Sequence, residues 1–135
     1  MALQYSVSVR NAQLDAIETT IGTSAVLKIR TGAPPASCAT ADSGTVLATL
    51  TLPSDWMAAA ASGSKSMSGT WEDSSADATG TAAHWRLYAS DGTTCHAQGT
   101  VTAGGGGGDM TVDNTSFSAG QAFSVTSFTI TAGNA

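Results

Sequence analysis

The spacing of apolar residues along the chain changes once, near Gly22, from a helical period to a strand period. Before that point the apolar stripe of a helix is formed by Leu14, Ile17 and Ile21, extended one turn earlier by Arg10, while the opposite side carries Asn11, Asp15 and Thr19. Ser8 is a suitable N-cap, and Gly22 is suited to end the helix. The pattern predicts a helix over residues 9–21 that lies on a sheet or on a neighbouring subunit. An N-terminal arm, residues 1–8, precedes it.

After Gly22 the apolar and polar residues alternate with the period of two that is typical of half-buried strands. The predicted strands cover residues 25–30, 46–52, 65–72, 82–90, 95–101, 109–113 and 121–131. Residues 57–61 follow a proline and a capping aspartate, and they predict one or two helical turns. Seven or eight short strands after one helix indicate a mainly β fold. We expect a single antiparallel β-sandwich or jelly-roll-like domain over residues 9–135.

Three irregular places interrupt this pattern. Residues 32–44 contain two consecutive prolines and predict a loop. Residues 104–108 are five consecutive glycines, which predict a flexible connection or a hairpin tip. In the last strand the apolar phase changes between Val125 and Phe128, so we expect a bulge near Thr126 or Ser127.

The clearest hairpin joins residues 82–90 to residues 95–101 around Asp91-Gly92. A two-residue loop would pair Tyr88 with Cys95 and mix polar and apolar residues on each face. A three-residue loop shifts the register by one residue and puts Cys95 on an apolar face with Trp85 and Leu87, so the burial pattern favours this second register. The other face then carries His84, Arg86, Tyr88, His96 and Gln98.

Two surfaces are candidates for interaction. The polar face of the hairpin is open to three interpretations, a solvated sheet face, a subunit contact, or a ligand or metal site, although two His without a nearby carboxylate make a weak zinc site. The N-terminal segment, residues 2–9, is expected to become ordered on contact with a neighbour. The predicted interaction residues are Leu3, Tyr5, Val7, His84, Arg86, Tyr88, His96 and Gln98.

The composition indicates a thin core. Ala, Gly, Ser and Thr make up 76 of the 135 residues, whereas Leu, Ile, Val and Phe number only 21. The low charged fraction, 11%, and the three Trp argue against disorder, because disordered segments combine low hydrophobicity with high charge. A net charge of −5 excludes a non-specific nucleic-acid binder, which needs clustered positive charge. Such a chain is expected to derive part of its stability from partner subunits, as a homo-oligomer.

The sequence also constrains the cellular context. It has no apolar run near the roughly 18 residues needed to span a membrane, and we expect no membrane partner. Its N-terminus does not resemble a secretory signal. Cys38 and Cys95 are therefore expected to be reduced thiols made in a cytoplasm, with a disulfide between them as the alternative.

Signals for chemistry are weak. Cys95 and His96 are adjacent in a strand and point to opposite faces, so they do not form a nucleophile–base pair. Asp109, Asp113 and Asn114 are possible calcium ligands, but a polar hairpin end explains them equally well. The three Trp are expected mainly in the core, with sugar stacking as the alternative. We therefore expect no enzymatic activity, no cofactor and no metal.

Several segments together resemble small, mostly uncharacterised structural proteins of tailed bacteriophages. They are residues 10–22, Leu52-Pro-Ser-Asp-Trp56, Ser68-Gly-Thr-Trp71, Asp91-Gly-Thr-Thr-Cys-His96, Gly107-Gly-Asp-Met-Thr111 and Thr131-Ala-Gly-Asn134. The likeness covers nearly the whole chain. It implies a virion role rather than an enzyme, and it supplies no catalytic residues.

Within that class the expected role is a capsid decoration or cement protein that binds and stabilises the assembled head. The expected partners are the phage major capsid protein or other virion proteins, and the expected location is the virion, assembled in the host cytoplasm. The alternative is a tail- or head-fibre-associated accessory protein, or a glycan-binding module on the virion surface.

Overall fold

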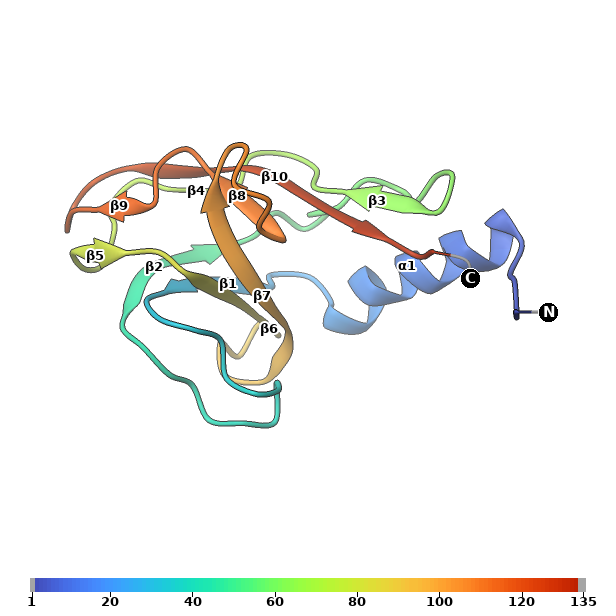
Figure 1. The fold of residues 1–135 in the computed structure, drawn as a ribbon, viewed down its shortest axis with the longest axis horizontal. Coiled ribbons are helices and arrows are strands. Elements are labelled where there is room, and N and C mark those ends of the chain that lie inside the picture. Colours follow the sequence, from blue (N-terminus) through green and yellow to red (C-terminus); the bar gives the residue numbers. More distant parts are fainter. Residues whose placement is uncertain (1, 134–135) are drawn as a thin grey trace.

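The structure is a computed structural model that describes residues 2–133, and it has a mainly β fold with one N-terminal helix, as predicted (Figure 1). The elements are α1 (Val7–Ile21), β1 (Val26–Arg30), β2 (Val46–Thr51), β3 (Ser64–Ser66), β4 (Glu72–Asp73), β5 (Gly80–Thr81), β6 (His84–Tyr88), β7 (Cys95–Ala103), β8 (Met110–Val112), β9 (Ser116–Phe117) and β10 (Phe123–Thr131). The larger sheet has the order β2-β1-β6-β7-β8-β10-β3, with β4 paired to β10, and β5 and β9 form a small second sheet.

The larger sheet is mixed rather than antiparallel throughout, because β7 and β8 run parallel, with Val101 opposite Met110. Parallel neighbours usually need a crossover of a dozen or more residues, but the glycine run makes this connection much shorter. Gly105 and Gly107 have φ values of 85° and 78°, which favour glycine. A Cβ at Gly106 would lie 2.6 Å from the Cβ of Thr102. The run thus turns back tightly against β7 and connects two parallel strands, so the predicted hairpin tip is wrong, whereas the flexibility of the connection stays a prediction.

The sheet curls so that strands distant along its path pack against each other. Trp85 on β6 contacts Phe128 on β10 edge-on, with ring centroids 5.2 Å apart. Trp71 lies 5.6 Å from Phe128 and 6.0 Å from Trp56 by the same measure. All three Trp are buried, which agrees with the prediction that they belong mainly to the core. A few large aromatic groups therefore fill an interior otherwise supplied by small side chains.

The β6–β7 hairpin combines the two registers that the sequence allowed. Trp85 lies opposite Gly99 and Leu87 opposite Ala97, as the favoured register predicts. Beyond them a bulge that includes His96 shifts the pairing, and Tyr88 lies opposite Cys95. Cys95 consequently shares a face with Tyr88, and its predicted place on the apolar face is wrong. The bulge predicted in the last strand is confirmed, since β10 changes register between Val125 and Ser127.

Helix α1 begins at Val7, two residues earlier than predicted, because Ser6 rather than Ser8 is the N-cap and accepts a hydrogen bond from the backbone N–H of Val9. The described part of the arm is therefore residues 2–6. Gly22 ends the helix, as predicted. Leu14 and Ile21 are buried, and Ile17 packs beside the core.

The polar side of α1 contacts the chain rather than solvent. Asn11 accepts a hydrogen bond from the backbone N–H of Gly63 at 2.9 Å. Lys65, on β3, is buried and lies 2.8 Å from an oxygen of Asp15 and 3.0 Å from an oxygen of Glu18. Two ion pairs and one hydrogen bond to a backbone N–H thus hold the helix against β3 and the segment before it.

The predicted helical turns over residues 57–61 are absent. Met57 forms an isolated antiparallel bridge with Met67, and Ala61 forms one with Ser64. Helix carboxylates bind the backbone of this segment, since Glu18 accepts from the N–H of Met57 at 3.1 Å. Tertiary contacts therefore override the local helix propensity of the alanine run.

Candidate functional site

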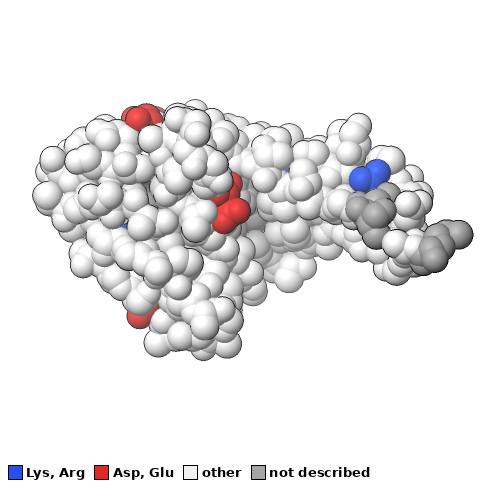
Figure 2. All heavy atoms as spheres, viewed as in Figure 1, with Lys and Arg blue, Asp and Glu red and all other residues white. Residues whose placement is uncertain are grey.

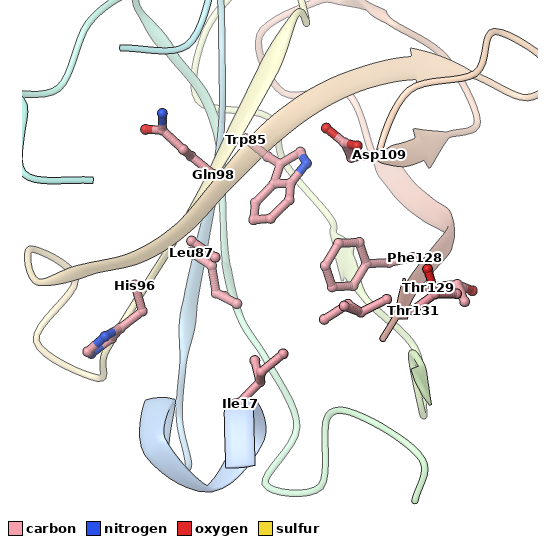
Figure 3. A pocket seen from close by; sticks show the side chains of 11 residues that line it. Ile17, Trp85, Leu87, His96, Gln98, Asp109, Phe128, Thr129 and Thr131 are labelled. Atoms are coloured by element: carbon pink, nitrogen blue, oxygen red, sulfur yellow. The ribbon is translucent and has the colours of Figure 1, made fainter. Parts of the chain in front are cut away.

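A hollow of about 470 Å³ lies between α1 and the strands β6, β7 and β10 (Figure 3). Its apolar walls come from Ile17, Trp85, Leu87, Phe128 and Ile130. Two polar side chains, His96 and Asp109, lie at opposite ends of it in Figure 3. An apolar hollow of this size suits a side chain or a small apolar group.

A second hollow, of about 290 Å³, continues along α1 and shares Ile17 and His96 with the first. We call the two together the α1 groove. The indole N–H of Trp85 is buried beside the groove without a hydrogen-bond partner. Asp109 is engaged locally, because its carboxylate accepts hydrogen bonds from the backbone N–H and the hydroxyl of Thr100, at 2.9 and 3.1 Å.

The N-terminal segment carries the large apolar side chains that the fold leaves exposed. Within residues 2–133, all of them fall between positions 3 and 9. They are Leu3, Tyr5, Val7 and Val9, with exposed fractions of 71%, 43%, 45% and 41%. The structure therefore places the three predicted arm residues at the surface, and Val9 is a fourth that the sequence prediction omitted.

The predicted polar face of the hairpin has a different environment from the expected one. His84, Arg86 and Tyr88 are buried, so the prediction that they form an exposed face is wrong. The loop over residues 31–45, between β1 and β2, covers them; we call it the covering loop. Of the other two predicted residues, His96 is exposed and lines the α1 groove, and Gln98 is half-buried.

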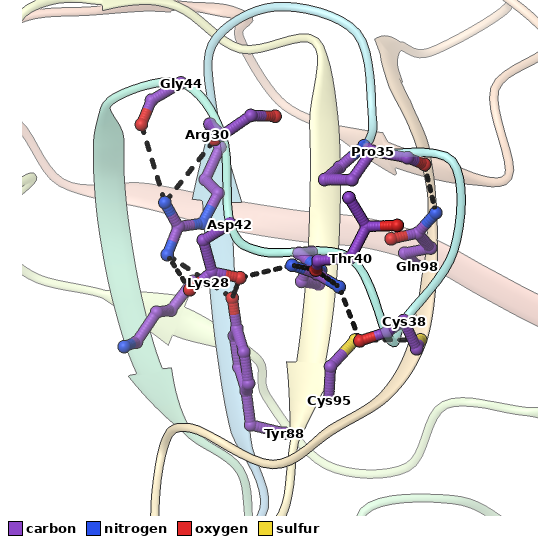
Figure 4. A network of polar contacts seen from close by, with 12 residues as sticks. Lys28, Arg30, Pro35, Cys38, Thr40, Asp42, Gly44, Tyr88, Cys95 and Gln98 are labelled. Carbon is purple, nitrogen blue, oxygen red and sulfur yellow. Dashed lines mark hydrogen bonds and ion pairs between the residues drawn. The ribbon is translucent and has the colours of Figure 1, made fainter.

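Asp42 is the centre of the polar cluster beneath the covering loop (Figure 4). One carboxylate oxygen accepts a hydrogen bond from Arg30 at 2.9 Å. The other accepts from Tyr88 at 2.8 Å and forms an ion pair with Arg86. One carboxylate thus faces two buried guanidinium groups, so the described cluster carries a net positive charge.

This arrangement shifts two pKa values. Burial alone would raise the pKa of Asp42, but the Tyr88 hydroxyl and the two guanidinium groups outweigh it and hold that pKa below its usual value. Burial raises the pKa of Tyr88 to about 12, and the neighbouring Asp42 carboxylate adds to the shift. Both groups therefore keep one protonation state across the physiological range and act as structural members.

Backbone carbonyl groups of the covering loop complete the cluster. Arg86 donates hydrogen bonds to the carbonyl oxygens of Ser37, Cys38 and Thr40, at 3.0–3.2 Å. The Nδ1 atom of His84 lies 2.7 Å from the carbonyl oxygen of Gly32. The face below the loop is a second, polar interior rather than a docking surface.

Cys38 and Cys95 meet at the edge of this cluster as free thiols, with their sulfur atoms 2.8 Å apart. Burial raises the pKa of Cys95 to about 11, and the nearby Cys38 sulfur adds to the rise. The expectation of reduced thiols left a disulfide between them open as the alternative, although the favoured register placed Cys95 on the apolar face of the hairpin.

The other candidates have local structural roles. Asp113 accepts a hydrogen bond from the backbone N–H of Ser124, and Asn114 accepts one from that of Ser116. Within the described chain, no three His, Cys, Asp or Glu side chains gather closely enough to hold a metal ion. The burial of all three Trp removes the exposed indole platform on which sugar stacking would depend.

No family model, curated protein or solved structure matches this chain. In residues 2–133 no helix is both long enough and apolar enough to cross a membrane. The candidate site has two parts, the exposed N-terminal segment and the α1 groove.

Proposed function

We propose that this protein is a non-enzymatic structural subunit of a tailed-phage virion, namely a capsid decoration or cement protein that binds the assembled head. The observation that carries the proposal is the concentration of exposed apolar side chains on residues 3–9. Isolated exposed apolar residues are ordinary, but a contiguous set at one end of a molecule suits a protein contact.

The energetics favour association through many weak contacts. Full burial of one aliphatic side chain contributes about 1.5–3 kcal/mol, so a short apolar arm gives only modest affinity in a single copy. On a lattice of identical subunits, or in a homo-oligomer, several such arms engage at once and the effective affinity rises steeply. A cement protein needs this behaviour, because it must recognise the assembled shell in preference to free subunits.

The distribution of charge agrees with a protein partner. Three of the five basic side chains, Arg30, Lys65 and Arg86, are buried in ion pairs inside the fold. Most of the surface in the space-filling view is uncharged (Figure 2). Such a surface lacks the clustered positive charge that binding to nucleic acid requires.

We also propose that the domain is a β-sandwich. The contact between Trp85 and Phe128 brings two parts of one curled sheet face to face, in the manner of a sandwich core. A β-sandwich whose thin core consists largely of small side chains suits a protein that is stabilised by its neighbours once it is assembled.

The location can be tested on gradient-purified virions of the phage that encodes the chain. Mass spectrometry should detect the chain in many copies, and cryo-electron microscopy of particles with and without it should show difference density over the head. Density at the tail or at a head fibre would replace the capsid assignment with the accessory alternative. Absence from the particles would overturn the proposal as a whole.

The role of the N-terminal segment can be tested on capsids stripped of the chain. The double variant Leu3→Ser and Val7→Ser should bind about 30-fold more weakly, which corresponds to about 2 kcal/mol of lost apolar burial. Ala122→Ser, a change at an exposed position outside the segment, is the matched control. Equal binding by both variants, with unchanged thermal stability, would contradict the proposed contact.

A further inference from the structure

We propose that Cys38 and Cys95 are a redox-modification site, whose oxidation forms an intramolecular disulfide that locks the covering loop onto β7. This inference does not depend on the proposed function. It rests on the geometry of the pair and on the contacts that fix each cysteine in place.

The two thiol groups are already close together. The two sulfur atoms lie 2.8 Å apart, whereas a disulfide bond measures about 2.05 Å. Closing the bond therefore requires a displacement of about 0.8 Å. Both side chains are partly exposed, so a small oxidant can reach them.

Cys38 lies in a loop without regular secondary structure, but side chains of β6 and β7 hold that loop in place. Arg86 donates a hydrogen bond to the carbonyl oxygen of Cys38 itself, at 3.0 Å. On the N-terminal side, Gln98 donates one to the carbonyl oxygen of Pro35, at 2.6 Å. On the C-terminal side, Asp42 is held by two guanidinium groups and a hydroxyl. The loop is therefore pinned on both sides of the cysteine.

Cys95 reaches this face only because of the bulge in β7. Without the shift between Leu87 and Tyr88, strand alternation would direct Cys95 towards the apolar face with Ala97. The bulge places it opposite Tyr88 and beside Cys38. Two independent features, a pinned loop and a local register shift, thus converge on one sulfur–sulfur contact.

The oxidant is a small disulfide of the glutathione class. The thiolate of one cysteine attacks a sulfur atom of that disulfide, forms a mixed disulfide and releases one glutathione thiolate. The thiolate of the second cysteine then attacks the protein sulfur, which forms the Cys38–Cys95 bond and releases the second glutathione thiolate. The protein loses two electrons, and the two protons from its thiols end on the two released glutathione molecules.

The disulfide would make the fold more stable outside a reducing compartment. The bond would link positions 57 residues apart in sequence, and closing a loop of that length restricts the unfolded chain strongly. We expect the midpoint of thermal unfolding to rise by about 10 °C on oxidation and to fall back on reduction. The protein would be made with two free thiols, and the disulfide would form after release into an oxidising medium.

The test uses the purified full-length protein, equilibrated over a series of ratios of oxidised to reduced glutathione. After acid quenching, the intact monomer should be lighter by two hydrogen atoms. Tryptic digestion after denaturation, without reduction, should yield the peptide of residues 31–65 joined to that of residues 87–135. The unfolding midpoint should rise in parallel with the linked fraction, and Cys38→Ser should show neither change.

Three results would overturn the proposal. The thiols could remain alkylatable across the whole series, each cysteine could carry its own glutathione, or the bond could join two chains in a covalent dimer. A matched pair of variants tests the pinning of the loop. Asp42→Asn should lower the equilibrium constant for oxidation about tenfold by loosening the loop, whereas Asp55→Asn, at an exposed position outside the cluster, should leave it unchanged. Equal constants in these two variants would refute the role given to the loop contacts.

Discussion

Replacing Asp42 with Asn tests whether the covering loop is held by charge. The substitution keeps the size of the side chain and an oxygen that can accept the hydrogen bond from Tyr88. It removes the negative charge shared by Arg30 and Arg86, whose exposed fractions are 6% and 1%. The two guanidinium groups would then remain buried with no counter-ion in the described cluster.

The size of the effect follows from this burial. Removing one partner from a fully buried ion pair costs about 3–5 kcal/mol. The Asp42 side chain, however, is 39% exposed, so water screens part of the interaction. The expected cost therefore lies below the lower end of that range. We expect Asp42→Asn to lower the free energy of unfolding by about 2 kcal/mol at pH 7, a shift of about 1 M in the urea midpoint.

The stabilisation by Asp42 depends on pH in a definite direction. The folded-state pKa of Asp42 lies below the ordinary value of 3.8, so the folded protein binds fewer protons there than the unfolded chain. The stabilisation is therefore complete above about pH 4 and is lost as the pH falls through the folded-state pKa. The difference between wild type and Asp42→Asn should stay constant from pH 5 to 8 and shrink below pH 4.

Urea unfolding followed by Trp fluorescence at pH 7, 5 and 3 measures this difference, with Asp55→Asn as the control. Loss of less than about 0.5 kcal/mol at pH 7, relative to that control, would show that the charge does not hold the loop. An undiminished difference at pH 3 would refute the assignment of the effect to ionisation of Asp42.

Three further changes test other parts of the fold by the same unfolding assay. Lys65→Met removes a buried ammonium group from two helix carboxylates and should cost about 2 kcal/mol; a neutral result would show that the ion pairs of Lys65 do not help to hold α1. Gly99→Ala places a Cβ 2.9 Å from the ring of Trp85 and should cost about 1–3 kcal/mol, whereas Gly104→Ala, with open space around it, should change little; equal effects would contradict the packing argument. Ser6→Ala removes the helix N-cap and should cost about 1 kcal/mol, and no loss of helix stability would favour Ser8 as the cap.

The sequence was informative where one local pattern dominates. The alternation of apolar residues identified most of the strands, and the phase change between Val125 and Phe128 located the bulge in β10. The helix was found from three aliphatic residues, although its start was placed two residues late. These features depend on contacts close in sequence, which a periodicity reports directly.

The candidate site was only partly predictable, because its decisive contacts join distant segments. His84, Arg86 and Tyr88 have the alternation of an exposed strand face, and only the three-dimensional structure shows that residues 31–45 cover them. A usable signal was present: the loop carries the single carboxylate of Asp42, close in sequence to Arg30. The predicted residues of the N-terminal segment, Leu3, Tyr5 and Val7, are exposed, and their role in interaction stays a prediction.

The burial of basic side chains has a consequence for digestion by proteases. A trypsin-like enzyme cuts after Lys or Arg and must draw several residues around the cut site into its cleft. Of the five basic residues, Arg30, Lys65 and Arg86 are enclosed by the fold, and Lys28 lies in β1 between two paired strands, which leaves the peptide bond after Arg10 as the more accessible target. The native chain thus hides most of its cleavable bonds, and exposing them requires opening the structure. If the protein has the proposed virion role, this arrangement would couple its lifetime among proteases directly to its folding stability.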